Sequence, residues 1–233
     1  MAAVFPLVLV PGLLCSARLY APQVTALWSF GQVAVANHRR DDTMAAIAAR
    51  ILADAPPRFA LAGLSMGGYI AFAMLRQAPE RIAKLALLDT SARPDTAEQS
   101  AGREKFIAMA QAGKLGDVVE ALTPRFLHRN RHNDETLKRV VREMAADTGA
   151  EAFVRQQKAI RSRPDSRPLL ATVHCPTLVL VGEGDELTPP ELAREICTGI
   201  SDARLVVVAN CGHLSTLEKP DEVNRALVEW LEA

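Results

Sequence analysis

Residues 59–69 read Phe-Ala-Leu-Ala-Gly-Leu-Ser-Met-Gly-Gly-Tyr, and this stretch carries the strongest structural signal in a chain of 233 residues. An apolar run leads into Gly-Leu-Ser-Met-Gly, and a segment with the apolar spacing of a helix follows and ends before Pro79. The pattern predicts a strand, a sharp turn and a helix, with Ser65 at the apex of the turn.

A serine in such a turn is a candidate nucleophile. Because a serine hydroxyl is a weak nucleophile, it needs a base beside it and backbone N–H groups that can receive an oxyanion. Gly63 and Gly67, two residues either side of Ser65, are expected to remove a clash between strand and helix, and Gly68 to relieve it further. Met66 begins the helix, where the helix dipole is positive, so its N–H is expected to serve the oxyanion.

Composition is that of a soluble globular protein with one domain and an insertion. The hydrophobic fraction is 49%, the charged fraction is 23% and the formal net charge is zero. A neutral chain gives no indication of a nucleic-acid partner or of a charged membrane surface as partner.

The chain also lacks the patterns of targeting and metal-binding segments. No apolar run approaches the roughly 20 residues of a membrane span, and the apolar N-terminus has no basic region and is broken by Pro6 and Pro11. The cysteines lack metal-type spacing, so we expect free thiols, no metal, no cofactor and a cytoplasmic location. They are Cys15, Cys175, Cys197 and Cys211.

Strand patterns alternate with helix patterns, which predicts an α/β fold: a mostly parallel sheet of about six strands flanked by helices. The expected strands are residues 7–10, 32–36, the run from 59, 85–88, 177–181 and 204–208. The helix patterns of this part lie at residues 18–27, 44–53, after Ser65, from 189 or 190 to 197, and 220–231.

The alternation stops after the fourth strand. Residues 91–168 show only helix patterns, at 103–111, 117–122, 134–146 and 151–160. An all-helical insertion between two parallel strands lies over the carboxyl ends of the strands. We therefore expect a core of residues 1–90 and 169–233, and a helical lid of residues 91–168.

Two later strands end in groups that could serve Ser65. Residues 177–181 lead into Gly-Glu-Gly-Asp-Glu, which contains Asp185, and residues 204–208 lead into Asn-Cys-Gly-His, which ends at His213. Adjacent strands thus deliver an acid and a base to one end of the sheet, in the order Ser65, Asp185, His213. Other acids also lie at strand ends, namely Glu183, Glu186 and Asp89, and the other histidines are His38, His128, His132 and His174.

With these motifs in this order, the whole chain resembles the α/β-hydrolase fold superfamily, and within it small serine esterases and enol-lactonase-like hydrolases. The resemblance implies a second oxyanion-hole N–H at Leu13, beside that of Met66, with Leu14 next to it contacting substrate. Two features depart from the superfamily. Its usual His-Gly is Pro11-Gly12 here, so the loop must be held differently, and its two leading antiparallel strands have almost no room before Leu7.

The nucleophile also bears on the reaction. Haloalkane dehalogenases and epoxide hydrolases of this fold carry an aspartate at the position of Ser65, so both are disfavoured. The expected reaction is hydrolysis of a small-molecule carboxylic ester or lactone through an acyl-enzyme. A thioesterase, a C–C bond hydrolase and a non-catalytic binding protein on the same scaffold stay open as alternatives.

Charge is distributed unevenly along the chain. Residues 93–168 carry 15 Lys and Arg against 11 Asp and Glu, a net charge of +4 that leaves −4 for the rest. Most of these cations are expected to be solvated or paired, and exposed pairs contribute little. Because a cleft focuses even a modest excess, we hypothesise a substrate carboxylate, remote from the scissile bond, that is held by Arg125 or Arg129.

Overall fold

Six parallel strands form one sheet in the computed structural model, which describes residues 5–233. The sheet order is β2-β1-β3-β4-β5-β6. The strands are β1 (Leu7–Val10), β2 (Val33–Val35), β3 (Phe59–Leu64), β4 (Ile82–Leu88), β5 (Thr177–Gly182) and β6 (Ala203–Val208). The expected parallel sheet of about six strands is confirmed.

The register of the central strands aligns their carboxyl ends. β1, β3, β4 and β5 are buried along their whole length, as strands covered on both faces must be, whereas β2 and β6 form the partly exposed edges. Leu64 pairs with Leu88, and Leu88 pairs with Leu180. The Ser65 and Asp89 amides continue this ladder beyond the strands, at 2.9 and 2.8 Å from the next strand's carbonyls. The segments after β3, β4 and β5 therefore leave the sheet side by side.

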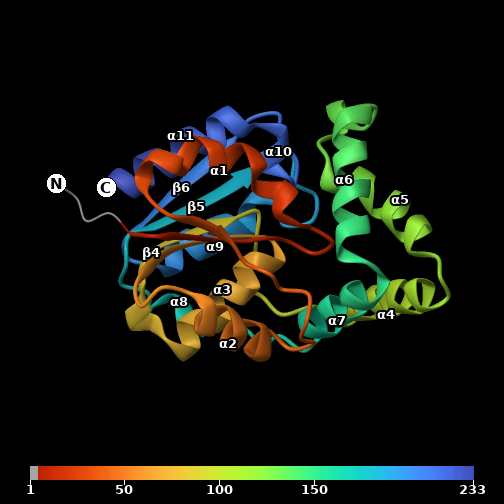
Figure 1. Ribbon diagram of the computed structural model, residues 1–233, viewed down its shortest axis with the longest axis horizontal. Coiled ribbons are helices and arrows are strands. Elements are labelled where there is room, and N and C mark those ends of the chain that lie inside the picture. The colour runs from red at the N-terminus through yellow and green to blue at the C-terminus, as the bar shows by residue number, and fades with distance from the viewer. Residues whose placement is uncertain (1–4) are drawn as a thin grey trace.

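Helices cover both faces of the sheet (Figure 1). One face carries α1 (Ala21–Leu27), α10 (Ser215–Glu218) and α11 (Pro220–Glu232), and the other carries α2 (Met44–Asp54), α3 (Met66–Gln77), α8 (Arg167–Leu170) and α9 (Pro190–Gly199). A hydrophobic core lies on each face of the sheet, and the side chains of β1 alternate between the two. Leu7 and Leu9 pack into the core on the face of α1 and α11, and Val8 and Val10 pack into the core on the face of α2 and α3. Short 3₁₀ turns are η1 (Ala17–Tyr20), η2 (Trp28–Phe30), η3 (Pro79–Arg81) and η4 (Arg129–Arg131).

Five helices lie between β4 and β5 in the chain, and all but α8 belong to one group. The helices of this group are α4 (Ala97–Gln111), α5 (Leu115–Phe126), α6 (Glu135–Thr148) and α7 (Ala150–Arg161). Figure 1 shows them beyond the end of the sheet toward which the strands point. We call residues 91–168 the helical insertion. Helix α4 starts six residues before its apolar pattern because Thr96 and Gln99 form a capping box.

No helix within residues 5–233 combines the length and the apolar character that crossing a bilayer requires.

Candidate active site

The turn after β3 holds Ser65 in a strained conformation. Its φ of 56° and ψ of −114° lie outside the regions that non-glycine residues prefer. A Cβ atom at Gly63 would collide with the Gly67 carbonyl, as expected for a tight strand–helix turn. A Cβ atom at Gly67 would instead meet the end of β1, and one at Gly68 would meet the Thr90 side chain. The glycines thus let two neighbouring segments, as well as the turn itself, approach Ser65.

Ser65, His213 and Asp185 form a continuous hydrogen-bonded path. Ser65 Oγ lies 2.8 Å from His213 Nε2, and His213 Nδ1 lies 2.7 Å from Asp185 Oδ2. The three side chains follow β3, β6 and β5, so the expected convergence at the carboxyl end of the sheet is present. With the Nδ1 proton held by Asp185, Nε2 is free to accept the Ser65 proton.

Asp185 is buried and held from several sides. Its Oδ1 accepts the Leu187 and Thr188 N–H groups at 2.8 and 3.0 Å, and the Thr188 hydroxyl donates to Oδ2 at 2.7 Å. Burial acts to raise the pKa of Asp185, but the charge of His213 and these hydrogen bonds outweigh it and hold the pKa below 3.8. Burial acts to lower the pKa of His213, but Asp185 raises it above the ordinary value of 6.5. The pair therefore favours an ionised acid and stabilises a protonated imidazole.

Asp89, the rival acid, is engaged elsewhere. Its Oδ1 accepts the Gly182 N–H at 2.9 Å and its Oδ2 accepts the Ser215 hydroxyl at 2.5 Å. Burial and the charge of Asp185 raise the pKa of Asp89 to about 8. Asp89 thus connects β4 to β5 and α10 rather than contacting His213. The other two acids considered, at positions 183 and 186, have exposed side chains.

The helical insertion contacts the loop that carries His213 and holds it in place. The Phe126 carbonyl accepts the N–H of His213 and that of the next residue, both at 3.1 Å, and the Phe126 ring stacks on the imidazole with centroids 6.2 Å apart. The buried Glu218 carboxylate joins the same two segments, since it accepts the Gly212 N–H at 3.0 Å and the His128 N–H at 2.8 Å. The end of α5 therefore fixes the position of His213.

Two backbone amides are available for an oxyanion. Gly12 packs so closely that a Cβ atom there would lie 3.4 Å from Ser65 Cβ, which brings Leu13 to the rim of the same cavity. Among residues 5–233, neither the Leu13 nor the Met66 amide donates a hydrogen bond to the protein. These are the two donors that the sequence resemblance implies.

The loop that carries Leu13 is held by residues distant in the sequence. The Leu14 N–H donates to Gln156 Oε1 at 3.1 Å, and His38 Nε2 lies 2.9 Å from the Gly12 carbonyl. Gln156 Nε2 in turn lies 3.0 Å from His38 Nε2. Both side chains are buried, and burial lowers the pKa of His38 to about 4, so the ring is neutral near pH 7. Sequence reasoning gave no role to this pair, because only the fold brings α7 to the loop.

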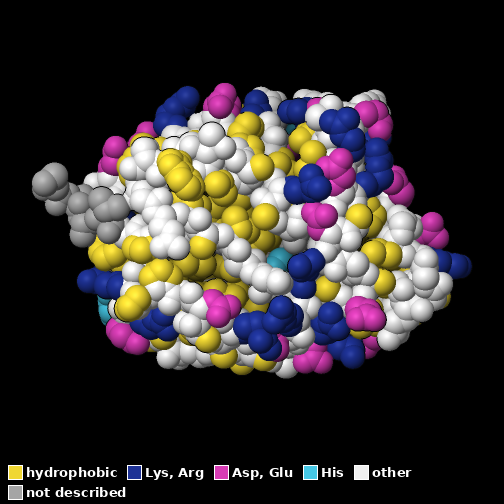
Figure 2. Space-filling view, viewed as in Figure 1, with side chains coloured by type: hydrophobic (Ala, Val, Ile, Leu, Met, Phe, Trp, Pro, Cys, Tyr) yellow, Lys and Arg dark blue, Asp and Glu magenta, His cyan; other side chains and the backbone are white. Residues whose placement is uncertain are grey.

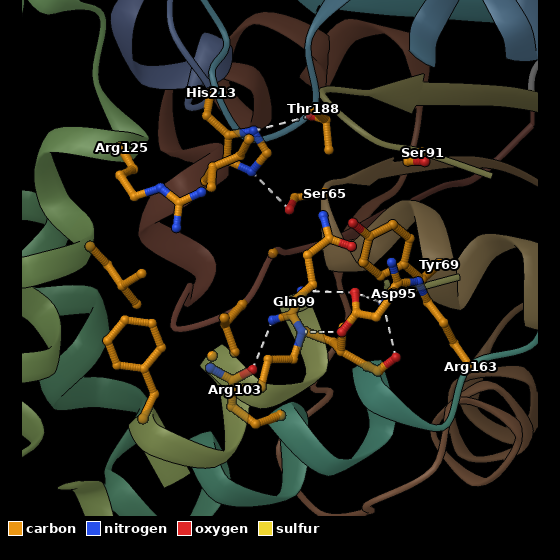
Figure 3. A pocket seen from close by; sticks show the side chains of 18 of the residues that line it. Ser65, Tyr69, Ser91, Asp95, Gln99, Arg103, Arg125, Arg163, Thr188 and His213 are labelled. Atoms are coloured by element: carbon orange, nitrogen blue, oxygen red, sulfur yellow. Dashed lines mark hydrogen bonds and ion pairs between the residues drawn. The ribbon is translucent and has the colours of Figure 1, made fainter. Parts of the chain in front are cut away.

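A cavity of about 590 Å³ opens beside Ser65 and His213 (Figure 3). Leu13 lines it, and so does Arg125, one of the three expected substrate contacts, but the other two do not. The positive φ of 59° turns Leu14 away, and its side chain is buried in the core at 2% exposure. Arg129 lies in η4, beyond the end of α5. Among residues 5–233, no group of three or more His, Cys, Asp or Glu side chains could hold a metal ion.

Residues 6–226 match the model of the alpha/beta hydrolase family. A thermophilic esterase from Thermogutta terrifontis is 31% identical, with a TM-score of 0.90 over 98% of this chain and 89% of that chain. The enol-lactonase from Burkholderia xenovorans LB400 has a TM-score of 0.87 over 99% of this chain and 93% of that chain, and at 24% identity it shows the fold alone. The 2-hydroxy-6-oxo-6-phenylhexa-2,4-dienoate hydrolase of Comamonas testosteroni is 29% identical over 177 residues, 73% of this chain and 62% of that protein.

Proposed function

We propose that this chain, which belongs to the alpha/beta hydrolase family, is a serine hydrolase. It would cleave a carboxylic ester or lactone of a small molecule through an acyl-enzyme. The observation that carries the proposal is the path from Ser65 Oγ through His213 to Asp185, with distances of 2.8 and 2.7 Å, at the wall of a cavity. The esterase from Thermogutta terrifontis, at 31% identity, supports the same reaction class.

Acylation would begin when Ser65 Oγ attacks the substrate carbonyl while His213 Nε2 takes the hydroxyl proton. The carbonyl electron pair moves onto oxygen, where the Leu13 and Met66 amides stabilise the negative charge. As the tetrahedral intermediate collapses, the bond to the alcohol oxygen breaks and His213 returns the proton to that oxygen. In a lactone, this alcohol stays attached to the acyl group.

Deacylation would repeat these steps with water. His213 Nε2 takes a proton from a water molecule, whose oxygen attacks the acyl carbon, and the same two amides receive the oxyanion. The intermediate then releases the carboxylic acid, and the proton on His213 returns to Ser65 Oγ. Asp185 stays ionised throughout and offsets the charge of the imidazolium.

The helical insertion would act as the lid of this site over a core of residues 1–90 and 169–233. Its α4, α5 and α7 supply much of the cavity wall, and the Phe126 contacts support a part in positioning His213. A cover of this kind excludes water and strengthens the electrostatic interactions inside.

The test is a panel of p-nitrophenyl esters, lactones, acyl thioesters and a substrate with a scissile C–C bond next to a ketone, with trapping of the acyl-enzyme by mass spectrometry. Ser65→Ala is expected to fold normally and to lose roughly 10³-fold or more in kcat/KM, because the covalent route disappears. Ser162→Ala changes an exposed serine at the end of α7; it is the matched control and is expected to keep its activity. Normal labelling of Ser65→Ala by a serine-directed organophosphonate would contradict the assignment.

A further inference from the structure

The cavity wall carries an excess of positive charge, and we infer that the substrate bears a free carboxylate that Arg125 binds. The inference rests on the proposed function and names its substrate class. Two acidic side chains line the cavity, Asp95 and Glu98. The lining cations are Arg93, Arg103, Lys105, Arg125 and Arg163.

Three of these cations are already occupied by protein carboxylates. Asp95, whose side chain is 1% exposed, accepts Arg103 Nε at 2.5 Å and an Arg163 guanidinium nitrogen at 2.7 Å. Arg163 also lies over the Tyr69 ring, 4.2 Å from its centroid. Arg93 pairs with Glu195, at 2.9 Å. These arginines hold the wall of the cavity together, and their guanidinium groups are not free for a ligand.

Arg125 differs from them. Among residues 5–233 its guanidinium makes no ion pair or hydrogen bond, although it lies in the last turn of α5 against the cavity. Figure 3 shows it pointing into the cavity on the side of His213, with Arg103 and Asp95 on the far side. The next residue, Phe126, accepts the His213 N–H at 3.1 Å, so the Arg125 backbone is fixed relative to the catalytic base.

The chemistry of this position fits a single carboxylate. A guanidinium binds a carboxylate through two parallel hydrogen bonds, and it stays charged at every working pH. Apolar side chains line the same cavity, which suits a short hydrocarbon segment between the carboxylate and the ester: Leu13, Leu122, Phe126, Leu187 and Leu214. Among the cations that line the cavity, Lys105 is the other one that makes no ion pair within residues 5–233; it lies on α4 and offers a point charge without this geometry.

The experiment compares p-nitrophenyl hydrogen adipate with its methyl ester, which has the same shape and no charge. In the wild type, kcat/KM is expected to be higher for the anionic ester. Arg125→Gln is expected to lower the anionic-to-neutral ratio about 10- to 100-fold, mainly through KM, and Arg125→Lys to restore part of it. Arg129→Gln removes the same charge outside the cavity and is expected to change the ratio less than about twofold.

An anionic-to-neutral ratio that Arg125→Gln leaves unchanged would overturn the inference, while Ser65-dependent hydrolysis of the neutral ester would leave the proposed function intact. Calorimetry gives a readout without turnover: monomethyl adipate is expected to bind Ser65→Ala, and to bind the Ser65→Ala/Arg125→Gln double variant about 10- to 100-fold more weakly. If the wild type hydrolyses neither ester and the organophosphonate does not label Ser65, the proposed function fails and the inference fails with it.

Discussion

Two buried aspartates lie near His213, and their hydrogen bonds separate their roles. Asp185 contacts Nδ1 at 2.7 Å, whereas Asp89 accepts from Gly182 and Ser215. The pKa of Asp185 is held below its ordinary value and that of Asp89 is raised to about 8. One site therefore carries an ionised acid at neutral pH, and the other carries an acid that is mostly protonated.

Asp185→Asn is expected to reduce kcat by roughly 10³- to 10⁴-fold, because an amide favours the wrong imidazole tautomer and cannot offset the charge on His213. Asp89→Asn replaces a largely neutral acid with a neutral amide of the same shape, so its loss is expected to stay below about tenfold near pH 7. Steady-state kinetics of both variants on one ester show which of the two aspartates serves His213. Greater sensitivity at Asp89 would move the acid to the end of β4.

Helix α7 supports the loop that carries Leu13 through one buried side chain. Gln156 accepts the Leu14 N–H at 3.1 Å and contacts His38, which in turn lies 2.9 Å from the Gly12 carbonyl. Leu14 has a positive φ of 59°, a conformation that persists only where the surroundings enforce it. A helix of the insertion therefore holds Leu14 directly and contacts the histidine that lies against Gly12.

Gln156→Ala is expected to lower kcat about 10- to 100-fold with little change in KM, because the loop loses its support and the Leu13 amide no longer faces the oxyanion. Affinity for a boronic acid, which mimics the tetrahedral intermediate, is expected to fall by a similar factor. Lys158→Ala, exposed on the same helix, is the control. A rise in KM at constant kcat and unchanged boronate affinity would show that Gln156 does not position the oxyanion hole.

The molecule as a whole is neutral but polarised. The net charge is +4 over residues 93–168 and −4 over the rest. Ten of the 15 cations in that segment form ion pairs, and Figure 2 shows both signs interspersed over the helical insertion. The excess therefore comes from few side chains, of which Arg125 and Lys105 line the cavity.

We expect the kcat/KM advantage of the anionic adipate ester over its methyl ester to shrink as the ionic strength rises from about 10 mM to about 500 mM, because salt screens the attraction between exposed charges. The neutral ester serves as the control and is expected to show no such trend. Stopped assays at a series of NaCl concentrations measure both. An anionic-to-neutral ratio that is greater than one and independent of salt would mean that contact with Arg125, and not the field of the insertion, supplies the preference.

Much of this architecture can be predicted from sequence patterns alone. Apolar runs, glycines and prolines encode the strands, the turn at Ser65 and the helices, because these depend on neighbours within a few residues. Parallel strands then bring Asp185 and His213 to the edge that holds Ser65, where the structure finds them in contact. Some element boundaries differ from the pattern, as at α4, where the cap lies outside the apolar pattern.

Tertiary structure alone decides the contacts made across long separations. Gln156 reaches Leu14 over 142 residues and His38 over 118, and no local pattern marks either contact. Similarly, no sequence pattern distinguishes Arg125 from Arg129. Helix α5 ends between them, and only Arg125 lines the cavity. The physical reason is that local patterns report backbone preference and burial, whereas the partner of a buried polar group is set by how whole elements pack.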